Sequence, residues 1–272
     1  IDASGTVVQS TAPDFQVGDE VMVTSYEMGV ERWGGWAEFV RAPSEWVLPL
    51  PPGLSHADSM TLGTAGLAAG LSVRALQEHD VLPNSGDVVV TGATGGVGCL
   101  SVTLLAKLGY TVVAVTGKRD KAEWLRSLGA TRVVSREEIF ADAKRPLNSA
   151  RWAGAVDTVG DGMLASLLPC VKNEGCVAAC GVAGGGSLET TVYPFVIRGV
   201  TLRGIDTAWC SLQRRREIWD LFANTWRLEA LQSIRHTVGL SDLAARSEQI
   251  LDGSNVGRTV VDLGSEVLDA GS

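Results

Sequence analysis

The sequence lacks the features that would place it in a membrane or on a nucleic acid. None of its apolar runs approaches the roughly 20 residues that a helix needs to cross a bilayer. Its 23 Lys and Arg stand against 31 Asp and Glu, whereas phosphate backbones are bound by an excess of basic residues. We therefore expect a soluble protein with no membrane partner and no nucleic-acid partner.

Cysteine and histidine are sparse and scattered. The five cysteines are an odd number without a close C-x-x-C pair, and the three histidines stand far apart. Disulfide frameworks and structural zinc sites both need clusters of these residues. The sequence predicts reduced core thiols in a cytoplasmic protein and no metal site. It also offers no Ser-His-Asp arrangement and no carboxylate pair that would compete for a catalytic role.

What the chain does contain is an alternation of short apolar strands and amphipathic helices. With 272 residues, of which 45% are hydrophobic, it can form one large domain or two modest ones. The alternation predicts an α/β fold, a Rossmann-type doubly wound parallel sheet. Its expected strands are residues 87–91, 111–115, 132–134, 155–159, 176–180 and 200–205. Its expected helices are residues 60–76, 97–108, 121–128 and 163–171.

The two ends of the chain differ from this central part. Residues 1–8, 17–23, 36–41 and 46–48 are predicted strands of a β-rich unit, which the three prolines at 49, 51 and 52 end. After the sheet, we expect helices at 211–226 and 241–251 and strands at 236–240 and 257–263, with a frayed tail from Gly264. We therefore predict three parts: 1–58, 59–207 for dinucleotide binding, and 208–272.

The glycine-rich loop at residues 92–98 carries the most specific signal. It shows the G-x-G-x-x-G spacing with Ala93 in the first glycine's place, followed by Gly95 and Gly98. Gly95 allows the backbone to approach a pyrophosphate, and Gly98 allows the next helix to pack on the strand. Strand, loop, helix and second strand follow in the required order within about 30 residues, so a dinucleotide site is favoured over a simple tight turn.

The end of the second strand indicates which dinucleotide is bound. An NAD site usually places Asp or Glu there to accept hydrogen bonds from the ribose hydroxyls. This chain has Thr116, Gly117, Lys118 and Arg119, and a hydroxyl with two cations attracts a 2′-phosphate. The sequence therefore favours NADPH. The alternative is that Lys118 and Arg119 are only a solvated pair at the entry to a helix.

A series of motifs along the chain resembles the medium-chain dehydrogenase/reductase superfamily, in its zinc-free quinone oxidoreductase branch, and within it the bacterial acrylyl-CoA reductases. The motifs are Gly18-Asp19 with Val21, Trp33-Gly34-Gly35-Trp36-Ala37-Glu38, Gly63-Thr64-Ala65-Gly66, the loop 92–98, Asp157-Thr158-Val159-Gly160, Ala179-Cys180-Gly181 and Gly257-Arg258-Thr259. The resemblance implies that residues 1–58 are part of a GroES-like catalytic domain. Family members carry a further segment before the point that matches Ile1, and the polar groups beside the nicotinamide are expected there.

The resemblance also implies a set of cofactor-binding positions. The pyrophosphate loop is matched by Thr94, Gly95, Gly96 and Val97, and the group at the 2′-phosphate by Thr116, Gly117, Lys118 and Arg136. Positions near the nicotinamide or leaning toward the cofactor are Thr64, Gly181, Val182, Ile205, Asp206, Thr207 and Arg258. Each has a plainer alternative: Thr116 only caps, Arg136 is a surface group, Val182 is a core residue, and Arg258 pairs with a carboxylate. No residue is assigned a catalytic role.

The function that the resemblance implies is hydride transfer from NADPH to an α,β-unsaturated thioester such as acrylyl-CoA. The protein would contribute orientation and charge stabilisation. Two alternatives stay open, namely a quinone or enone reductase on the same scaffold and a protein that binds NADPH without turnover. A homodimer is expected.

Overall fold

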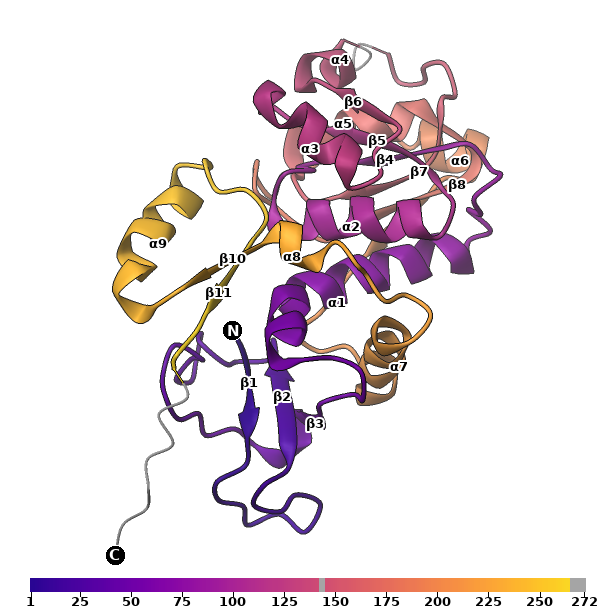
Figure 1. The fold of residues 1–272 in the computed structure, drawn as a ribbon. Helices are drawn as coiled ribbons and strands as arrows, with labels where there is room; N and C mark the ends of the chain where they lie inside the picture. Colours follow the sequence, from indigo (N-terminus) through magenta and orange to yellow (C-terminus); the bar gives the residue numbers. More distant parts are fainter. Residues whose placement is uncertain (142–144, 265–272) are drawn as a thin grey trace, which may run out of the picture.

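A six-stranded parallel sheet forms the centre of the molecule (Figure 1). The computed structural model describes residues 1–141 and 145–264, so the predicted frayed tail lies outside the described residues beyond Gly264. The sheet has the order β6-β5-β4-β7-β8-β9 and confirms the predicted doubly wound fold. Because the strand order reverses between β4 and β7, a ligand crevice is expected beside their carboxyl ends.

The strands of this sheet are short and rich in valine and alanine. In β4, Val88 and Val90 face one apolar core while Val89 faces the other, and all three are fully buried. A strand covered on both faces reads as a continuous apolar run. The six strands are β4 (Asp87–Val90), β5 (Thr111–Val115), β6 (Arg132–Val134), β7 (Trp152–Asp157), β8 (Val171–Ala179) and β9 (Thr201–Gly204).

Helices cover both faces of the sheet. On one face lie α1 (His56–Glu78) and α2 (Gly96–Lys107), with α7 (Leu212–Ala223) packed against α1, and on the other face lies α5 (Asp161–Leu167). The expected helix at 163–171 ends early because Pro169 lies in a 3₁₀ turn (Leu168–Cys170) and β8 starts at Val171. Shorter helices are α3 (Ala122–Ser127), α4 (Arg136–Phe140), α6 (Tyr193–Arg198) and α8 (Leu231–Ile234), of which α4, α6 and α8 were not predicted.

The first 49 residues form a small antiparallel sheet, which we call the β-rich unit. Its strands are β1 (Asp2–Thr6), β2 (Glu20–Thr24) and β3 (Val47–Pro49), in that order. The predicted strand at 36–41 is wrong. Residues 36–38 form a bend and 39–41 have no regular structure, and the apolar side chains of Trp36 and Phe39 remain exposed because no other part of the described chain covers them.

The C-terminal part returns to the β-rich unit and the glycine loop. Its parallel strands β10 (Arg235–Val238) and β11 (Arg258–Val261) are joined through α9 (Leu243–Leu251). The amide of Gly257 donates to the carbonyl of Thr94 at 2.9 Å, which ties the start of β11 to the glycine loop. The expected strands and helix of this part are confirmed within a few residues.

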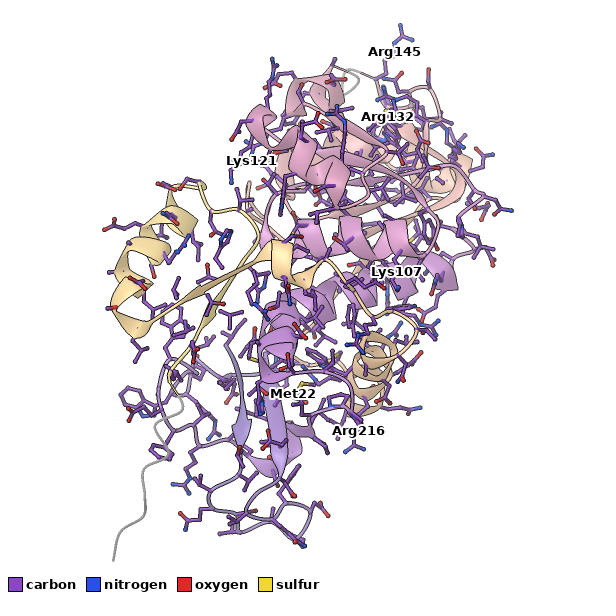
Figure 2. The ribbon with its side chains drawn as sticks, viewed as in Figure 1. Met22, Lys107, Lys121, Arg132, Arg145 and Arg216 are labelled. Atoms are coloured by element: carbon purple, nitrogen blue, oxygen red, sulfur yellow. The ribbon has the colours of Figure 1, made fainter. Side chains whose placement is uncertain are left out.

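Most charged side chains lie at the surface, with Asp157 and Arg215 as buried exceptions. Lys107, Arg132 and Arg216 are exposed at the periphery, whereas Met22 is buried between β2 and α1 (Figure 2). In the part of the chain that the structure describes, no helix combines the length and the apolar character needed to cross a bilayer.

Candidate functional site

The glycine loop joins β4 to the amino end of α2. Gly92 has a φ of +56°, a left-handed conformation that suits glycine, and turns the chain sharply after the strand. A Cβ atom on Gly98 would lie 2.8 Å from Ala93 Cα, so glycine is needed there for close packing of α2. This confirms the structural reason predicted for Gly98.

Gly95 differs from Gly98 because the protein leaves the space beside it largely unfilled. A Cβ atom there would meet only Gly92 O, at 3.2 Å, and the backbone angles (φ −78°, ψ 174°) are open to any residue. The neighbouring amides belong to the first turn of α2, and the positive end of this helix dipole favours an anion. The loop therefore fits a pyrophosphate, and a side chain on Gly95 would occupy that space.

Polar and cationic groups gather at the carboxyl end of β5. The hydroxyls of Thr94 and Thr116 are 3.4 Å apart, and Thr116 Oγ1 accepts a hydrogen bond from the Lys118 amide at 3.0 Å. The Arg136 guanidinium lies against Gly117, where an added Cβ would be 3.2 Å from Arg136 Cζ. The structure thus brings the four predicted 2′-phosphate residues together.

Lys118 and Arg119 are not equivalent in the structure. Arg119 is exposed, whereas Lys118 is half-buried and its ammonium donates to the backbone carbonyl of Asn255. Burial, and next the positive charge of Arg136, lower the pKa of Lys118 below its usual value. The solvated alternative therefore suits Arg119 but does not describe Lys118.

The residues predicted around the nicotinamide follow β8 and β9. Gly181 lies close to the turn after β7, since an added Cβ would be 2.9 Å from Thr158 C. Val182 is 69% exposed, which argues against the reading as a core residue. The Asp206 carboxylate accepts from the amides of Ala208 and Trp209, at 2.8 and 3.1 Å, so it holds its own turn.

A buried carboxylate that the sequence analysis did not select holds the crevice together. Asp157, at the end of β7, accepts from Thr91 Oγ1 at 2.7 Å and from the Gly160 amide at 2.8 Å. Burial raises its pKa, while the hydrogen bond from Thr91 opposes that rise. The side chains cross-link the ends of β4 and β7. The sequence signal that could have identified Thr91 and Asp157 is a polar residue at the end of each apolar strand.

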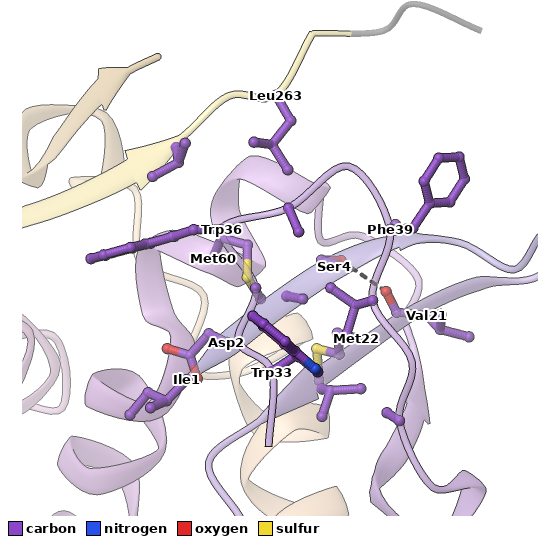
Figure 3. Close-up of a pocket in the computed structure, with 18 of the residues that line it drawn as sticks. Ile1, Asp2, Ser4, Val21, Met22, Trp33, Trp36, Phe39, Met60 and Leu263 are labelled. Carbon is purple, nitrogen blue, oxygen red and sulfur yellow. Dashed lines mark hydrogen bonds between the residues drawn. The ribbon is translucent and has the colours of Figure 1, made fainter. Parts of the chain in front are cut away.

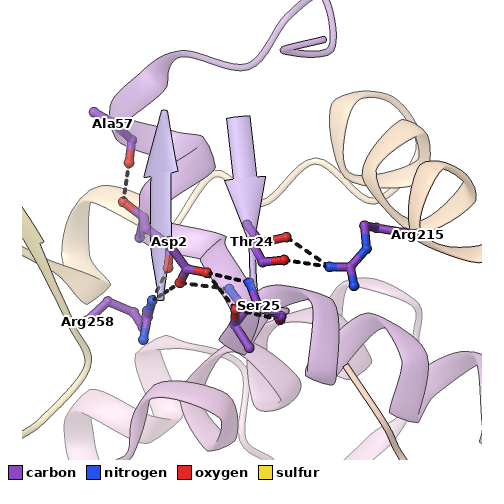
Figure 4. Close-up of polar contacts among 8 residues, drawn as sticks. Asp2, Thr24, Ser25, Ala57, Arg215 and Arg258 are labelled. Carbon is purple, nitrogen blue, oxygen red and sulfur yellow. Dashed lines mark hydrogen bonds and ion pairs between the residues drawn. The ribbon is translucent and has the colours of Figure 1, made fainter. Parts of the chain in front are cut away.

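Thr64 of α1 belongs to a polar cluster with Asp2, Ser25 and Arg258, three residues that Figure 4 labels. Its hydroxyl donates to Asp2 Oδ1 at 2.5 Å and its amide donates to Asp2 Oδ2 at 3.0 Å. Ser25 Oγ is 2.8 Å from Thr64 Oγ1, and the Thr64 hydrogen is already used, so Ser25 donates. Arg258 completes the cluster, with Nη2 3.8 Å from Asp2 Oδ2 and Nε donating to Thr61 O.

Gly63 makes room for this cluster. It interrupts α1 with φ 50° and ψ −152°, and a Cβ atom there would lie 3.0 Å from Arg258 Nη2 and 3.1 Å from Asp2 Cγ. The ion pair therefore stands where a side chain would otherwise be. A Cβ on Gly96 would lie 3.1 Å from Arg258 Cδ, so the same arginine also borders the glycine loop.

Ser4, His56 and Glu20 come together, with a glutamate in place of the aspartate of the Ser-His-Asp arrangement that the sequence analysis considered. Ser4 Oγ is 2.7 Å from His56 Nδ1, and His56 Nε2 contacts Glu20 Oε2. The Ser4 hydroxyl donates to Val21 O at 2.9 Å, so its hydrogen is not directed at the imidazole. The set links β1, β2 and α1 and does not present an activated nucleophile.

A groove of ≈ 2020 Å³ runs between the β-rich unit and the C-terminal part and reaches Gly96 (Figure 3). Its walls include β1, the segment 31–44, α9 and β11. Trp33 and Trp36, exposed by 94% and 60%, contribute apolar surface to it. A large molecule could therefore lie beside the glycine loop.

Comparison with known proteins places this geometry among dehydrogenases. A family model described as zinc-binding dehydrogenase matches residues 96–224. Within residues 1–141 and 145–264, no group of three or more His, Cys, Asp or Glu side chains is placed to hold a metal ion.

Two curated relatives align with almost the whole chain. The putative quinone oxidoreductase YhfP of Bacillus subtilis is 45% identical over 97% of this chain and 80% of the relative. The acrylyl-CoA reductase AcuI of Ruegeria pomeroyi is 44% identical over 97% of this chain and 80% of the relative.

Solved structures agree with this alignment. The yhdH oxidoreductase of Salmonella enterica in complex with NADP has a TM-score of 0.94 and 44% identity, over 97% of this chain and 81% of that chain. Bacillus subtilis yhfP with NAD bound has a TM-score of 0.94 and 45% identity, over 97% and 80%. The chain therefore belongs to the medium-chain dehydrogenase/reductase superfamily, among its quinone oxidoreductase-like members.

Proposed function

We propose that this chain binds NADPH and reduces the C=C bond of an α,β-unsaturated thioester such as acrylyl-CoA. The observation that carries the cofactor choice is the placement of Lys118 and Arg136 beside Thr116, where a carboxylate would favour NADH. The substrate class rests on the 44% identity to AcuI over 97% of the chain.

The residues around the crevice have distinct roles in this proposal. Thr94, Gly95, Gly96 and Val97 hold the pyrophosphate, and Thr116, Gly117, Lys118 and Arg136 hold the 2′-phosphate. Thr64, Gly181, Val182, Ile205, Asp206, Thr207 and Arg258 border the nicotinamide half. When bound, the cofactor supplies the hydride, and the chain orients it and excludes water from the reacting end.

The groups that stabilise the developing oxyanion and deliver the proton stay unassigned. Thr64 donates its hydroxyl hydrogen to Asp2, and the Asp206 carboxylate is occupied by two amides. In this state neither side chain presents a free donor to a substrate. The groove beside Gly96 exceeds the roughly 300–1,000 Å³ of ordinary small-molecule sites, so its size permits a coenzyme A thioester.

A second candidate function is the reduction of a quinone or enone. It is favoured by the 45% identity to the relative named a putative quinone oxidoreductase, on the same scaffold. Fold and cofactor site are shared between the two activities, because substrate choice depends on the pocket.

The test is a comparison of acrylyl-CoA with a simple quinone, each with NADPH and with NADH. We expect NADPH-dependent reduction of acrylyl-CoA to exceed quinone reduction. Faster turnover of the quinone would favour the second candidate. Cofactor binding without turnover of either acceptor would favour a binding protein, and equal use of NADH would contradict the assignment of Lys118.

Two further parts of the proposal concern assembly and metal. We propose a homodimer through the edge of the sheet, because β9 has no outer neighbour in the described sheet and Val192, Val196 and Ile197 beside it are more than half exposed. Sedimentation analysis tests this.

We also propose zinc-independent turnover, which is tested by an assay with a chelator and a zinc-supplemented control.

A further inference from the structure

Arg215 of α7 is a fully buried charge without a carboxylate partner among the described residues. Its exposed fraction is 0%. Its guanidinium lies 4.2 Å above the Tyr26 ring, which is stacked on Trp46 with ring centroids 5.0 Å apart. Burying an unpaired cation is unfavourable, and apolar side chains of similar volume often replace buried charges without loss of stability. Stability alone therefore gives no reason for an arginine here.

The hydrogen bonds of Arg215 join two segments that are far apart in the sequence. Nη1 donates to Thr24 O at 2.9 Å and to Thr24 Oγ1 at 3.1 Å, at the end of β2 (Figure 4). Nη2 donates to Thr207 O at 2.7 Å and to Ala208 O at 3.4 Å, after β9. The planar guanidinium is rigid, so it fixes the spacing of the acceptors that it binds.

Both segments adjoin residues that the proposed function places beside the nicotinamide. Thr24 is followed by Ser25 and Tyr26, which hold left-handed φ values of 65° and 55° that residues with side chains rarely adopt. Ser25 contacts Thr64, one of the residues proposed to border the nicotinamide half. Thr207 belongs to the stretch proposed to border the nicotinamide. Such backbone conformations persist where surrounding contacts enforce them, often at functional sites.

We propose that Arg215 is a positioning residue that fixes the separation of the β2 end and the 205–207 segment, and thereby the orientation of the nicotinamide. This inference rests on the proposed function for its catalytic consequence. Reaction rates depend steeply on geometry, and a displacement of about 1 Å can reduce a rate about 100-fold. The phosphate-binding loop has no contact with Arg215, so overall cofactor affinity should change little.

The test compares Arg215→Lys, which keeps the charge but loses the planar fork, with the milder Thr24→Val, which removes one acceptor. Arg214→Met is the matched control, since Arg214 is on the same helix and pairs with Glu78 at 2.6 Å on the surface. Three quantities are measured: cofactor affinity by titration, the circular dichroism of the bound reduced nicotinamide, and single-turnover hydride transfer to acrylyl-CoA. The cofactor is whichever of NADPH and NADH the unsubstituted protein binds.

We expect Arg215→Lys to alter the nicotinamide dichroism and to slow hydride transfer about 100-fold, with affinity nearly unchanged. Thr24→Val should shift the same signals less, and Arg214→Met should leave all three unchanged. Unaltered dichroism in Arg215→Lys overturns the inference. So does a loss of affinity, dichroism and rate in proportion to the unfolded fraction, because that result shows only a structural role.

The experiment can contradict the proposed function without contradicting the positioning role of Arg215. If the unsubstituted protein binds cofactor but does not reduce acrylyl-CoA, the substrate assignment is lost while the dichroism still decides the role of Arg215. If it binds neither NADPH nor NADH, the positioning role is overturned as well.

Discussion

The central sheet and the β-rich unit are stabilised in different ways. The valines of β4 are fully buried between two apolar cores, each formed by helices and strands. The β-rich unit has a core cluster of only three buried residues, Val23, Met28 and Trp46. Its contacts to the rest of the chain include polar ones, at Asp2 and Thr24. Apolar burial therefore sets the shape of the cofactor-binding half, while the β-rich unit is held both by Met22 and Leu48, which are buried in the main core, and by directional hydrogen bonds.

Trp46→Ala should produce the largest difference in stability between the β-rich unit and the central sheet. Loss of a buried tryptophan costs about 3–5 kcal/mol, and the three-residue cluster has little other apolar surface to compensate. We expect backbone amides of β1 and β2 to lose hydrogen-exchange protection, while those of β4 and β5 keep it and cofactor still binds. Trp33→Ala, at a side chain 94% exposed, is the control. Equal loss of protection in β4 would show that the two regions unfold as one.

Gly98→Ala and Gly95→Ala test the central region with the same added methyl group. At Gly98 the methyl would lie 2.8 Å from Ala93 Cα, and we expect a loss of about 2–3 kcal/mol in the free energy of unfolding. At Gly95 it meets only one carbonyl oxygen, at 3.2 Å, so stability should hold while cofactor affinity falls. Denaturant unfolding and cofactor titration measure both. Normal affinity in a folded Gly95→Ala protein would place the pyrophosphate elsewhere.

Lys118→Ala should weaken NADPH binding by about 1.5–3 kcal/mol and leave NADH nearly unaffected, because a hydrogen bond between charged groups is lost. Lys107→Ala, at the opposite end of α2 from the loop, controls for the change in net charge. Titration with both cofactors provides the measurement. The assignment fails if both cofactors lose affinity to the same extent.

Glu20→Gln should have the smallest effect. Hydrogen bonds from Thr6 and His56 lower the pKa of Glu20 in the folded protein. The ionised carboxylate therefore stabilises the folded state fully above its unfolded pKa of 4.5, and this stabilisation is lost as the pH falls through the folded pKa. The Glu20–His56 pair is half-exposed, so we expect Glu20→Gln to lower the free energy of unfolding by less than about 1 kcal/mol near neutral pH. In acid, the variant and the unsubstituted protein should be equally stable. Glu45→Gln, an exposed carboxylate of the same unit, is the control. A constant difference at all pH values would exclude the charge as the cause.

The dinucleotide-binding part could be predicted because its signals are local. Strand, glycine loop and helix follow one another between Asp87 and Lys107, and each glycine acts on its immediate neighbours. Lys118 was predicted from the hydroxyl and basic residues that follow the second strand, and Arg136 from the family resemblance. Whether they bind the cofactor stays a prediction.

The contacts that position the β-rich unit could not be predicted in the same way. Asp2 and Thr64 are separated by 62 positions, and Thr24 and Arg215 by 191. Nothing in the local sequence distinguishes Arg215, which is buried, from its neighbours Arg214 and Arg216, which are not. The strand expected at 36–41 was wrong for a related reason, because aromatic residues favour a strand only where a partner strand exists.

The contact between Lys118 and the carbonyl of Asn255 makes cofactor selection an exchange of partners. The Lys118 ammonium already has a partner without cofactor, since the backbone oxygen of Asn255 accepts its hydrogen bond. A dinucleotide with a phosphate can replace that oxygen with a stronger acceptor, whereas one with a free hydroxyl leaves the resting contact intact. Discrimination then equals the difference between two competing acceptors. Weakening the resting contact, by displacing the loop that carries Asn255, would raise the affinity for the phosphorylated cofactor alone.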